Sequence, residues 1–160
     1  MSPRRHTESI VSTLTKSGET VAVAESLTAG GLGHALTIAP GASQVFMGGI
    51  IAYTNEIKTN LLGVSLALIE EFSVVSEEVA IAMADAVREK FGTTWGIATT
   101  GIAGPGEHQG IPEGTVWIAI RGPVNQTLQL QLDSGREAVR TGAISSAIGA
   151  FARILSYRSS

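Results

Sequence analysis

The sequence contains no cysteine among its 160 residues. This absence excludes a disulfide framework, a thiolate nucleophile and any metal site built on cysteine ligands. Histidine is scarce as well, since only His6, His34 and His108 are present, and no two of them have the spacing typical of a zinc site. We therefore expect chemistry that uses neither a thiol nor a metal ion.

Charged residues are also few, at 16% of the chain, and acidic residues outnumber basic ones. The 11 basic and 14 acidic residues give a net charge of −3, and the longest basic run is Arg4-Arg5. A protein that binds duplex DNA normally carries a basic patch. We therefore expect no nucleic-acid partner.

Long hydrophobic runs are absent too. The apolar run that ends at Tyr53 is much shorter than the roughly 20 residues needed to cross a membrane. The N-terminal stretch MSPRRHTESIVSTLTKSGE lacks the apolar segment of a signal peptide. These features predict a cytoplasmic protein with no membrane partner.

Apolar residues and glycines are plentiful: 44% of the chain is hydrophobic and 19 residues are glycine. This amount of apolar side chain is enough for one buried core, and 160 residues are about the length of one domain. Hydrophobic periodicity and turn residues predict helices that alternate with strands. The predicted helices cover 7–17, a glycine-rich start at 28–33, 55–62, 66–71, 76–91 and 135–157; the predicted strands cover 20–24, 45–53, 95–100, 115–121 and 125–133.

This alternation is typical of a single three-layer α/β/α domain with a mainly parallel sheet. We expect that domain to occupy residues 1–160, with its core over about 7–157. The continuously apolar segment 45–53 indicates a strand covered on both faces. The segment 125–133 alternates leucine with glutamine, which predicts an antiparallel strand at an edge of the sheet after the Gly122-Pro123 turn.

Three predicted strand ends carry polar or glycine-rich residues, namely Glu25 to Gly31, Tyr53 to Lys58, and Thr99 to Gly106. Ligands of doubly wound sheets collect at the carboxyl ends of strands, so we expect these segments to converge. Each segment also has a plain structural explanation. A serine before a helix usually caps it, a single lysine is usually a solvated charge, and a glycine-rich loop often only turns the chain.

The functional alternative for the same segments is nucleophilic catalysis next to an anion site. Ser26 precedes a helix start with almost no side chains, where backbone N–H groups would hold an anion or an oxyanion. Lys58 would act as the base of Ser26 if burial lowered its pKa. Arg136 and Arg140, one helical turn apart, either clamp a phosphate or pair with acidic neighbours.

Five ordered blocks of the chain resemble the motifs of the CinA C-terminal domain family. They are AESLTAG at 24–30, GGIIAYTNEIKTNLLGV at 48–64, VSEEVAIAMA at 75–84, TGIAGPG at 100–106 and PEGTVWIAI at 112–120. The resemblance spans about residues 7–155. It implies the fold of that family and the activity of a nicotinamide-nucleotide amidohydrolase, which converts nicotinamide mononucleotide (NMN) to nicotinate mononucleotide and ammonia. It also implies a homodimer, and a chain without the N-terminal domain of the longer family members.

The resemblance further implies roles for individual residues. Ser26 is the expected nucleophile, assisted by Lys58 and Tyr53, in a hydrolysis that needs no metal or organic cofactor. Backbone N–H groups at 28–31 are expected to stabilise the oxyanion, and Arg140 with the 100–106 loop to hold the 5′-phosphate. The substrate-binding positions implied by the motifs are Thr28, Gly30, Gly31, Asn55, Thr100, Gly101, Gly104 and Arg140.

The chain departs from the family pattern at a few positions. Leu27 stands where the family often has cysteine, Ala29 where it often has glycine, and the segment 107–111 is shorter than usual, with Ile111 where a lysine is common. These departures concern the substrate more than the class of reaction. Two other functions are compatible with the sequence: a catalytically silent nucleotide-binding domain, and an interaction protein linked to DNA uptake or repair.

Overall fold

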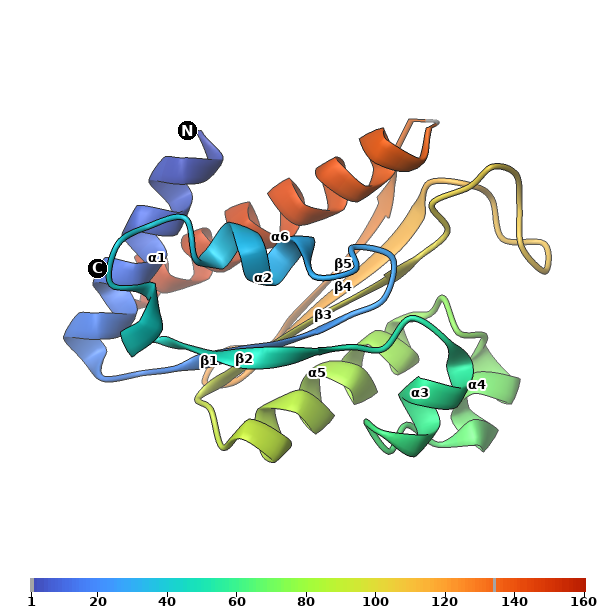
Figure 1. Ribbon diagram of the computed structural model, residues 1–160, viewed down its shortest axis with the longest axis horizontal. Helices are drawn as coiled ribbons and strands as arrows, with labels where there is room; N and C mark the ends of the chain where they lie inside the picture. The colour runs from blue at the N-terminus through green and yellow to red at the C-terminus, as the bar shows by residue number, and fades with distance from the viewer. Residues whose placement is uncertain (1, 134) are drawn as a thin grey trace.

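A five-stranded sheet with the order β2-β1-β3-β4-β5 forms the middle of the molecule, with helices on both faces (Figure 1). The structure is a computed structural model and describes residues 2–133 and 135–160. The predicted three-layer α/β fold is confirmed. One face is covered by α1 (Pro3–Ser17), α2 (Gly31–Leu36) and α6 (Arg136–Arg158), and the other by α3 (Asn55–Asn60), α4 (Leu66–Phe72) and α5 (Glu77–Phe91).

The sheet is mixed, and one interior strand runs against the other four. The strands are β1 (Val21–Glu25), β2 (Phe46–Ile51), β3 (Trp95–Gly101), β4 (Thr115–Arg121) and β5 (Gln126–Gln131). β1 pairs in parallel with β2 and β3, whereas β4 pairs antiparallel with both β3 and β5. The sequence predicted a reversal only after β4. The chain also reverses after β3, because a parallel neighbour needs a crossover connection and the 102–114 loop contains no helix.

The predicted edge strand is found where expected, but the strand at the other edge of the sheet was not predicted. β5 lies at one end of the sheet, as predicted, and β2 lies at the other. The prediction that β2 is covered on both faces is wrong, because Met47 and Ile51 are 43% and 54% exposed. A continuous apolar run is typical of a central strand, but the order of strands is set by the crossovers, which the run does not encode.

Helix ends follow the capping residues of the sequence. The side chain of Ser2 accepts a hydrogen bond from the backbone N–H of Arg5, so α1 begins at Pro3, four residues before the predicted start. The α5 helix begins after Ser76, whose hydroxyl accepts from the N–H of Val79, and ends at Gly92 as predicted.

Within residues 2–133 and 135–160, no helix combines the length and apolar character needed to cross a membrane.

The two faces of the sheet are packed differently. Large side chains of α1 and α6 fill one face, where Phe151 packs edge-on against Trp95 with ring centroids 5.3 Å apart. On the face covered by α5, the strands present small residues, including Ala22, Ala24, Ala98 and Ala119. Small residues let the backbone of α5 approach the sheet closely. At Gly96 the approach is so close that an added Cβ would lie 2.2 Å from the carbonyl oxygen of Ala84.

The register of the parallel strands sets the position of the candidate site. Glu25, the last residue of β1, pairs with Ile51 of β2 and with Thr99 of β3. The segments that follow the three strands therefore begin at the same edge of the sheet, as the sequence predicted.

The close contact between β3 and α5 can be tested with Gly96→Ala. Because the new methyl group meets backbone rather than a mobile side chain, we expect the free energy of unfolding to fall by about 3 kcal/mol. Gly149→Ala in α6 is the matched control, since its Cβ would meet no atom closer than 3.8 Å and alanine favours helix. Urea denaturation checks both, and equal effects of the two substitutions would contradict the packing described.

Candidate active site

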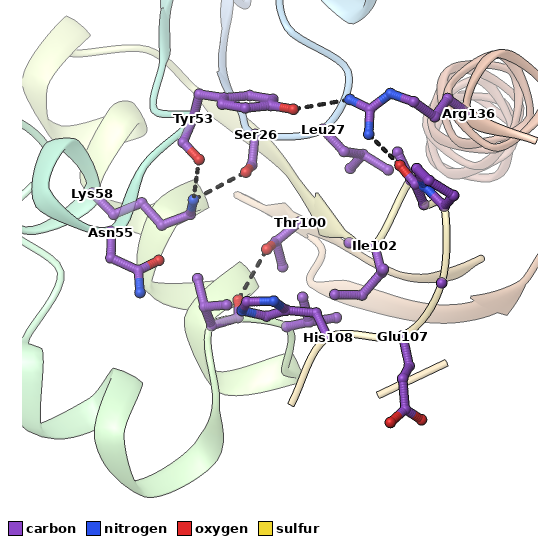
Figure 2. Close-up of a pocket in the computed structure, with 17 residues that line it drawn as sticks. Ser26, Leu27, Tyr53, Asn55, Lys58, Thr100, Ile102, Glu107, His108 and Arg136 are labelled. Atoms are coloured by element: carbon purple, nitrogen blue, oxygen red, sulfur yellow. Dashed lines mark hydrogen bonds between the residues drawn. The ribbon is translucent and has the colours of Figure 1, made fainter. Parts of the chain in front are cut away.

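A cavity of about 350 Å³ lies at the carboxyl ends of β1 and β3. Its walls come from the turn after β1, the segment from the end of β2 into α3, the loop after β3 and the start of α6 (Figure 2). This volume is within the usual range of small-molecule sites. The lining residues are Ser26, Leu27, Tyr53, Asn55, Lys58, Val74, Val75, Thr100, Gly101, Ile102, Ala103, Gly104, Pro105, Gly106, Glu107, His108 and Arg136.

Ser26 and Lys58 meet inside the cavity. Ser26 follows β1 directly, and its backbone N–H donates to the carbonyl oxygen of Thr99 at 3.1 Å, which anchors it to β3. The Lys58 Nζ lies 2.9 Å from the Ser26 Oγ and also donates to the carbonyl oxygen of Tyr53 at 3.3 Å. These contacts join a hydroxyl to an amine with the geometry that nucleophilic catalysis requires.

Burial changes the acidity of Lys58. Thr54 caps α3 by accepting from the N–H of Ile57, and this short helix directs the Lys58 side chain inward, where it is 1% exposed. Removal of water from the ammonium group lowers the pKa of Lys58 from 10.5 to about 8. A substantial fraction of the amine is therefore neutral near physiological pH, as a general base must be.

The turn after β1 is held by a carboxylate of the chain itself. Glu25 is 2% exposed, and its two carboxylate oxygens accept from the backbone N–H groups of Leu32 and Gly33 at 2.7 and 3.0 Å. The start of α2 is thus already occupied by an anion. This contact, which sequence analysis did not anticipate, ties the residue before Ser26 to the helix that follows it.

Two of the four backbone N–H groups at 28–31 that were predicted to receive an oxyanion are already hydrogen-bonded within this turn. The N–H of Ala29 donates to the carbonyl oxygen of Ser26, and that of Gly31 donates to the carbonyl oxygen of Thr28.

Leu27, which follows the serine and lines the cavity, was missed as a candidate. Its position directly after a predicted nucleophile was the signal that could have identified it.

Four of the eight predicted substrate-binding residues lie outside the cavity lining, namely Thr28, Gly30, Gly31 and Arg140. Thr28 is fully buried, and its hydroxyl shares a 2.7 Å hydrogen bond with that of Thr99. Gly30 and Gly31 allow close packing, because an added Cβ would lie 3.2 Å from Ile51 and 2.5 Å from Ile144, respectively. Asn55, Thr100, Gly101 and Gly104 line the cavity.

The two arginines at the start of α6 have different positions. The structure does not place Arg140 in the cavity lining, and its Nε atom is buried with no hydrogen-bond partner among the described residues. Arg136, one turn earlier, does line the cavity. Its Nη2 donates to the hydroxyl of Tyr53 at 3.1 Å, and its Nη1 donates to the carbonyl oxygen of Gly104 (Figure 2).

Acidic and histidine side chains do not gather into a metal site in the described part of the chain. No group of three such side chains is placed to hold a metal ion there. The Ser26 hydroxyl is hydrogen-bonded instead to the amine of Lys58.

Comparison with known proteins identifies the family. The profile of the CinA C-terminal domain matches residues 4–155. The chain belongs to the CinA C-terminal domain family. A CinA-like protein of Synechocystis sp. is 51% identical over 132 residues, which are 79% of this chain and 32% of that protein. A CinA-like protein of Frankia casuarinae is 42% identical over 147 residues, which are 91% of this chain and 34% of that protein. The chain thus spans about a third of the curated relatives it matches.

Solved structures support the same assignment of this CinA C-terminal domain. A CinA superfamily protein of Klebsiella pneumoniae superposes with a TM-score of 0.92 at 28% identity, covering 98% of this chain and 99% of that one. A CinA superfamily protein of Escherichia coli gives a TM-score of 0.90 at 29% identity, covering 96% and 90%. The similarity includes all layers of the fold.

The lowered pKa of Lys58 can be tested through stability. Between about pH 8 and 10.5 the unfolded chain keeps a proton on Lys58 that the folded chain has lost, so this residue makes stability rise with pH. Lys58→Met removes the titration. The free energy of unfolding of the variant minus that of the wild type should therefore fall by about 3 kcal/mol between about pH 7 and 10.5.

Urea denaturation at a series of pH values measures this difference. Lys90→Met, at an exposed position of α5, is the control for replacing a lysine by methionine. A constant difference between Lys58→Met and the wild type over this range would show that Lys58 titrates like a solvated lysine.

Proposed function

We propose that this CinA C-terminal domain hydrolyses the carboxamide of NMN and releases nicotinate mononucleotide and ammonia. The observation that carries the proposal is the 2.9 Å contact between the Ser26 hydroxyl and the buried amine of Lys58 inside a cavity. A serine hydroxyl is a weak nucleophile until a base removes its proton. An amine with a pKa of about 8 is well matched to that task.

The first half of the reaction forms an acyl-enzyme. The neutral Lys58 amine accepts the proton of the Ser26 hydroxyl as the serine oxygen bonds to the carboxamide carbon. The tetrahedral intermediate then breaks its carbon–nitrogen bond, and the leaving nitrogen takes the proton from Lys58 and departs as ammonia. The nicotinoyl group remains attached to Ser26 as an ester.

The second half regenerates the enzyme. A water molecule attacks the ester carbon while Lys58 accepts one of its protons. The bond to Ser26 then breaks, and the serine oxygen recovers a proton from Lys58. The new carboxylic acid releases its remaining proton to solvent, and nicotinate mononucleotide leaves as a carboxylate. The same amine thus acts as a base and then as an acid in both halves.

Other cavity residues have supporting roles in this proposal. Tyr53 orients the base, because its carbonyl oxygen accepts a hydrogen bond from Lys58. The backbone N–H of Leu27, next to the nucleophile, is the proposed donor to the oxyanion. Thr100 is held by its hydrogen bond to the carbonyl oxygen of Val74 and shapes the wall near the reacting group together with Asn55.

The nucleophile is tested by Ser26→Ala. We expect ammonia release from NMN to fall at least about 1,000-fold, because no other group in the proposal can form the ester. Ser12→Ala on the exposed side of α1 should retain the wild-type rate. EDTA should leave the wild-type rate unchanged, because none of the proposed steps uses a metal ion.

Two results would contradict this proposal. Near wild-type turnover by Ser26→Ala would remove Ser26 from the chemistry. Binding of NMN by the wild type without any ammonia release would identify a silent nucleotide-binding domain instead.

The base is tested by the dependence of kcat on pH. We expect kcat to rise with pH and to level off above about pH 8, since the neutral amine accounts for about a tenth of Lys58 at pH 7 and most of it at pH 9. Lys58→Arg keeps a cation but stays protonated, so it should be inactive across this range. A flat pH profile, or activity in Lys58→Arg, would argue against Lys58 as the base.

A further inference from the structure

Arg136 places a positive charge at the wall of the cavity, and no ion pair joins it to a carboxylate among residues 2–133 and 135–160. Its guanidinium donates to the Tyr53 hydroxyl and to the Gly104 carbonyl oxygen, and both acceptors are uncharged. Among the described residues, the ion pairs join other arginines to carboxylates: Arg4 to Glu8, Arg121 to Asp85 and Arg158 to Glu19. Glu107 also lines the cavity, but its carboxylate points away from Arg136 (Figure 2).

The cavity therefore has two cationic side chains with different surroundings. Lys58 is buried beside Ser26, whereas Arg136 is exposed at the first residue of α6. An exposed guanidinium with uncharged partners can exchange them for an anion without a large loss of hydration. Its planar fork of N–H groups matches the oxygens of a phosphate.

Tyr53 is hydrogen-bonded to both of these side chains. Its backbone carbonyl oxygen accepts from Lys58, and its phenolic oxygen accepts from Arg136. One tyrosine residue therefore spans the interval from the base to the guanidinium, along the wall of the cavity (Figure 2). In a pyridine mononucleotide, the carboxamide and the phosphate likewise lie at opposite ends of the molecule, separated by a six-membered aromatic ring and a ribose.

We infer that Arg136 binds the phosphate of the substrate and makes the site selective for a phosphorylated nucleotide over the corresponding nucleoside. The inference rests on the proposed deamidation, because it assumes that the carboxamide lies at Ser26. The phosphate oxygens replace the Tyr53 hydroxyl and the Gly104 carbonyl oxygen as acceptors. Arg140, which the family resemblance assigned to this role, lies outside the cavity lining.

The kinetic test compares NMN with nicotinamide riboside, which has no phosphate. Arg136→Gln should lower kcat/KM for NMN by about 10- to 100-fold and leave kcat/KM for the riboside unchanged. The kcat/KM of Arg136→Lys for NMN should lie between those of the wild type and Arg136→Gln, because lysine keeps the charge but lacks the planar fork of N–H groups. Arg153→Gln, at an exposed position of the same helix, is the control and should change neither value. An equal loss for both substrates, or no loss for NMN, would overturn the inference.

A binding test separates this inference from the proposed reaction. Calorimetry in the Ser26→Ala background needs no turnover, and there NMN should bind more tightly than the riboside. Adding Arg136→Gln should remove that difference. If it does so while the wild type releases no ammonia, the phosphate site stands and the deamidase proposal fails. Equal affinities for NMN and the riboside before Arg136 is changed would overturn the phosphate site.

Discussion

The hydrogen bond between Lys58 Nζ and Ser26 Oγ is the interaction on which the account of this domain depends. This contact requires a lysine side chain in the interior of the domain. Burial of an ammonium group disfavours its charged form. The domain therefore keeps in its interior a group that destabilises the fold at neutral pH. A buried amine of lowered pKa does not stabilise the fold, but it can accept the proton of a serine nucleophile. Active sites commonly lower the stability of a protein in this way.

The remainder of the fold keeps these two side chains next to each other. Parallel pairing of β1 with β2 and β3 brings the turn that carries Ser26 next to the segments that carry Tyr53 and Thr100. Glu25 then fixes the turn by binding the first N–H groups of α2 through both carboxylate oxygens. The same carboxylate already occupies the first N–H groups of α2, and we therefore assign the binding of a phosphate to Arg136, which lines the cavity.

Sequence reasoning predicted much of this arrangement and missed features set by tertiary packing. Strand ends with unusual residues predicted that Ser26, Tyr53 and Lys58 would converge, because parallel strands share an edge. The exposed edge position of β2 was not predictable from its apolar composition, since crossovers determine strand order. The choice between Arg136 and Arg140 was equally hidden: it depends on where α6 begins relative to the 102–114 loop, and one helical turn separates a cavity residue from one outside it.

The most direct test of the central claim is an NMR titration of the side-chain amine of Lys58 in the wild-type protein, assigned by comparison with Lys58→Met. We predict a pKa of about 8 for Lys58, well below the usual lysine value of 10.5. A Lys58 resonance that titrates near 10.5 would contradict this prediction, because the amine would then be fully protonated when Ser26 has to lose its proton.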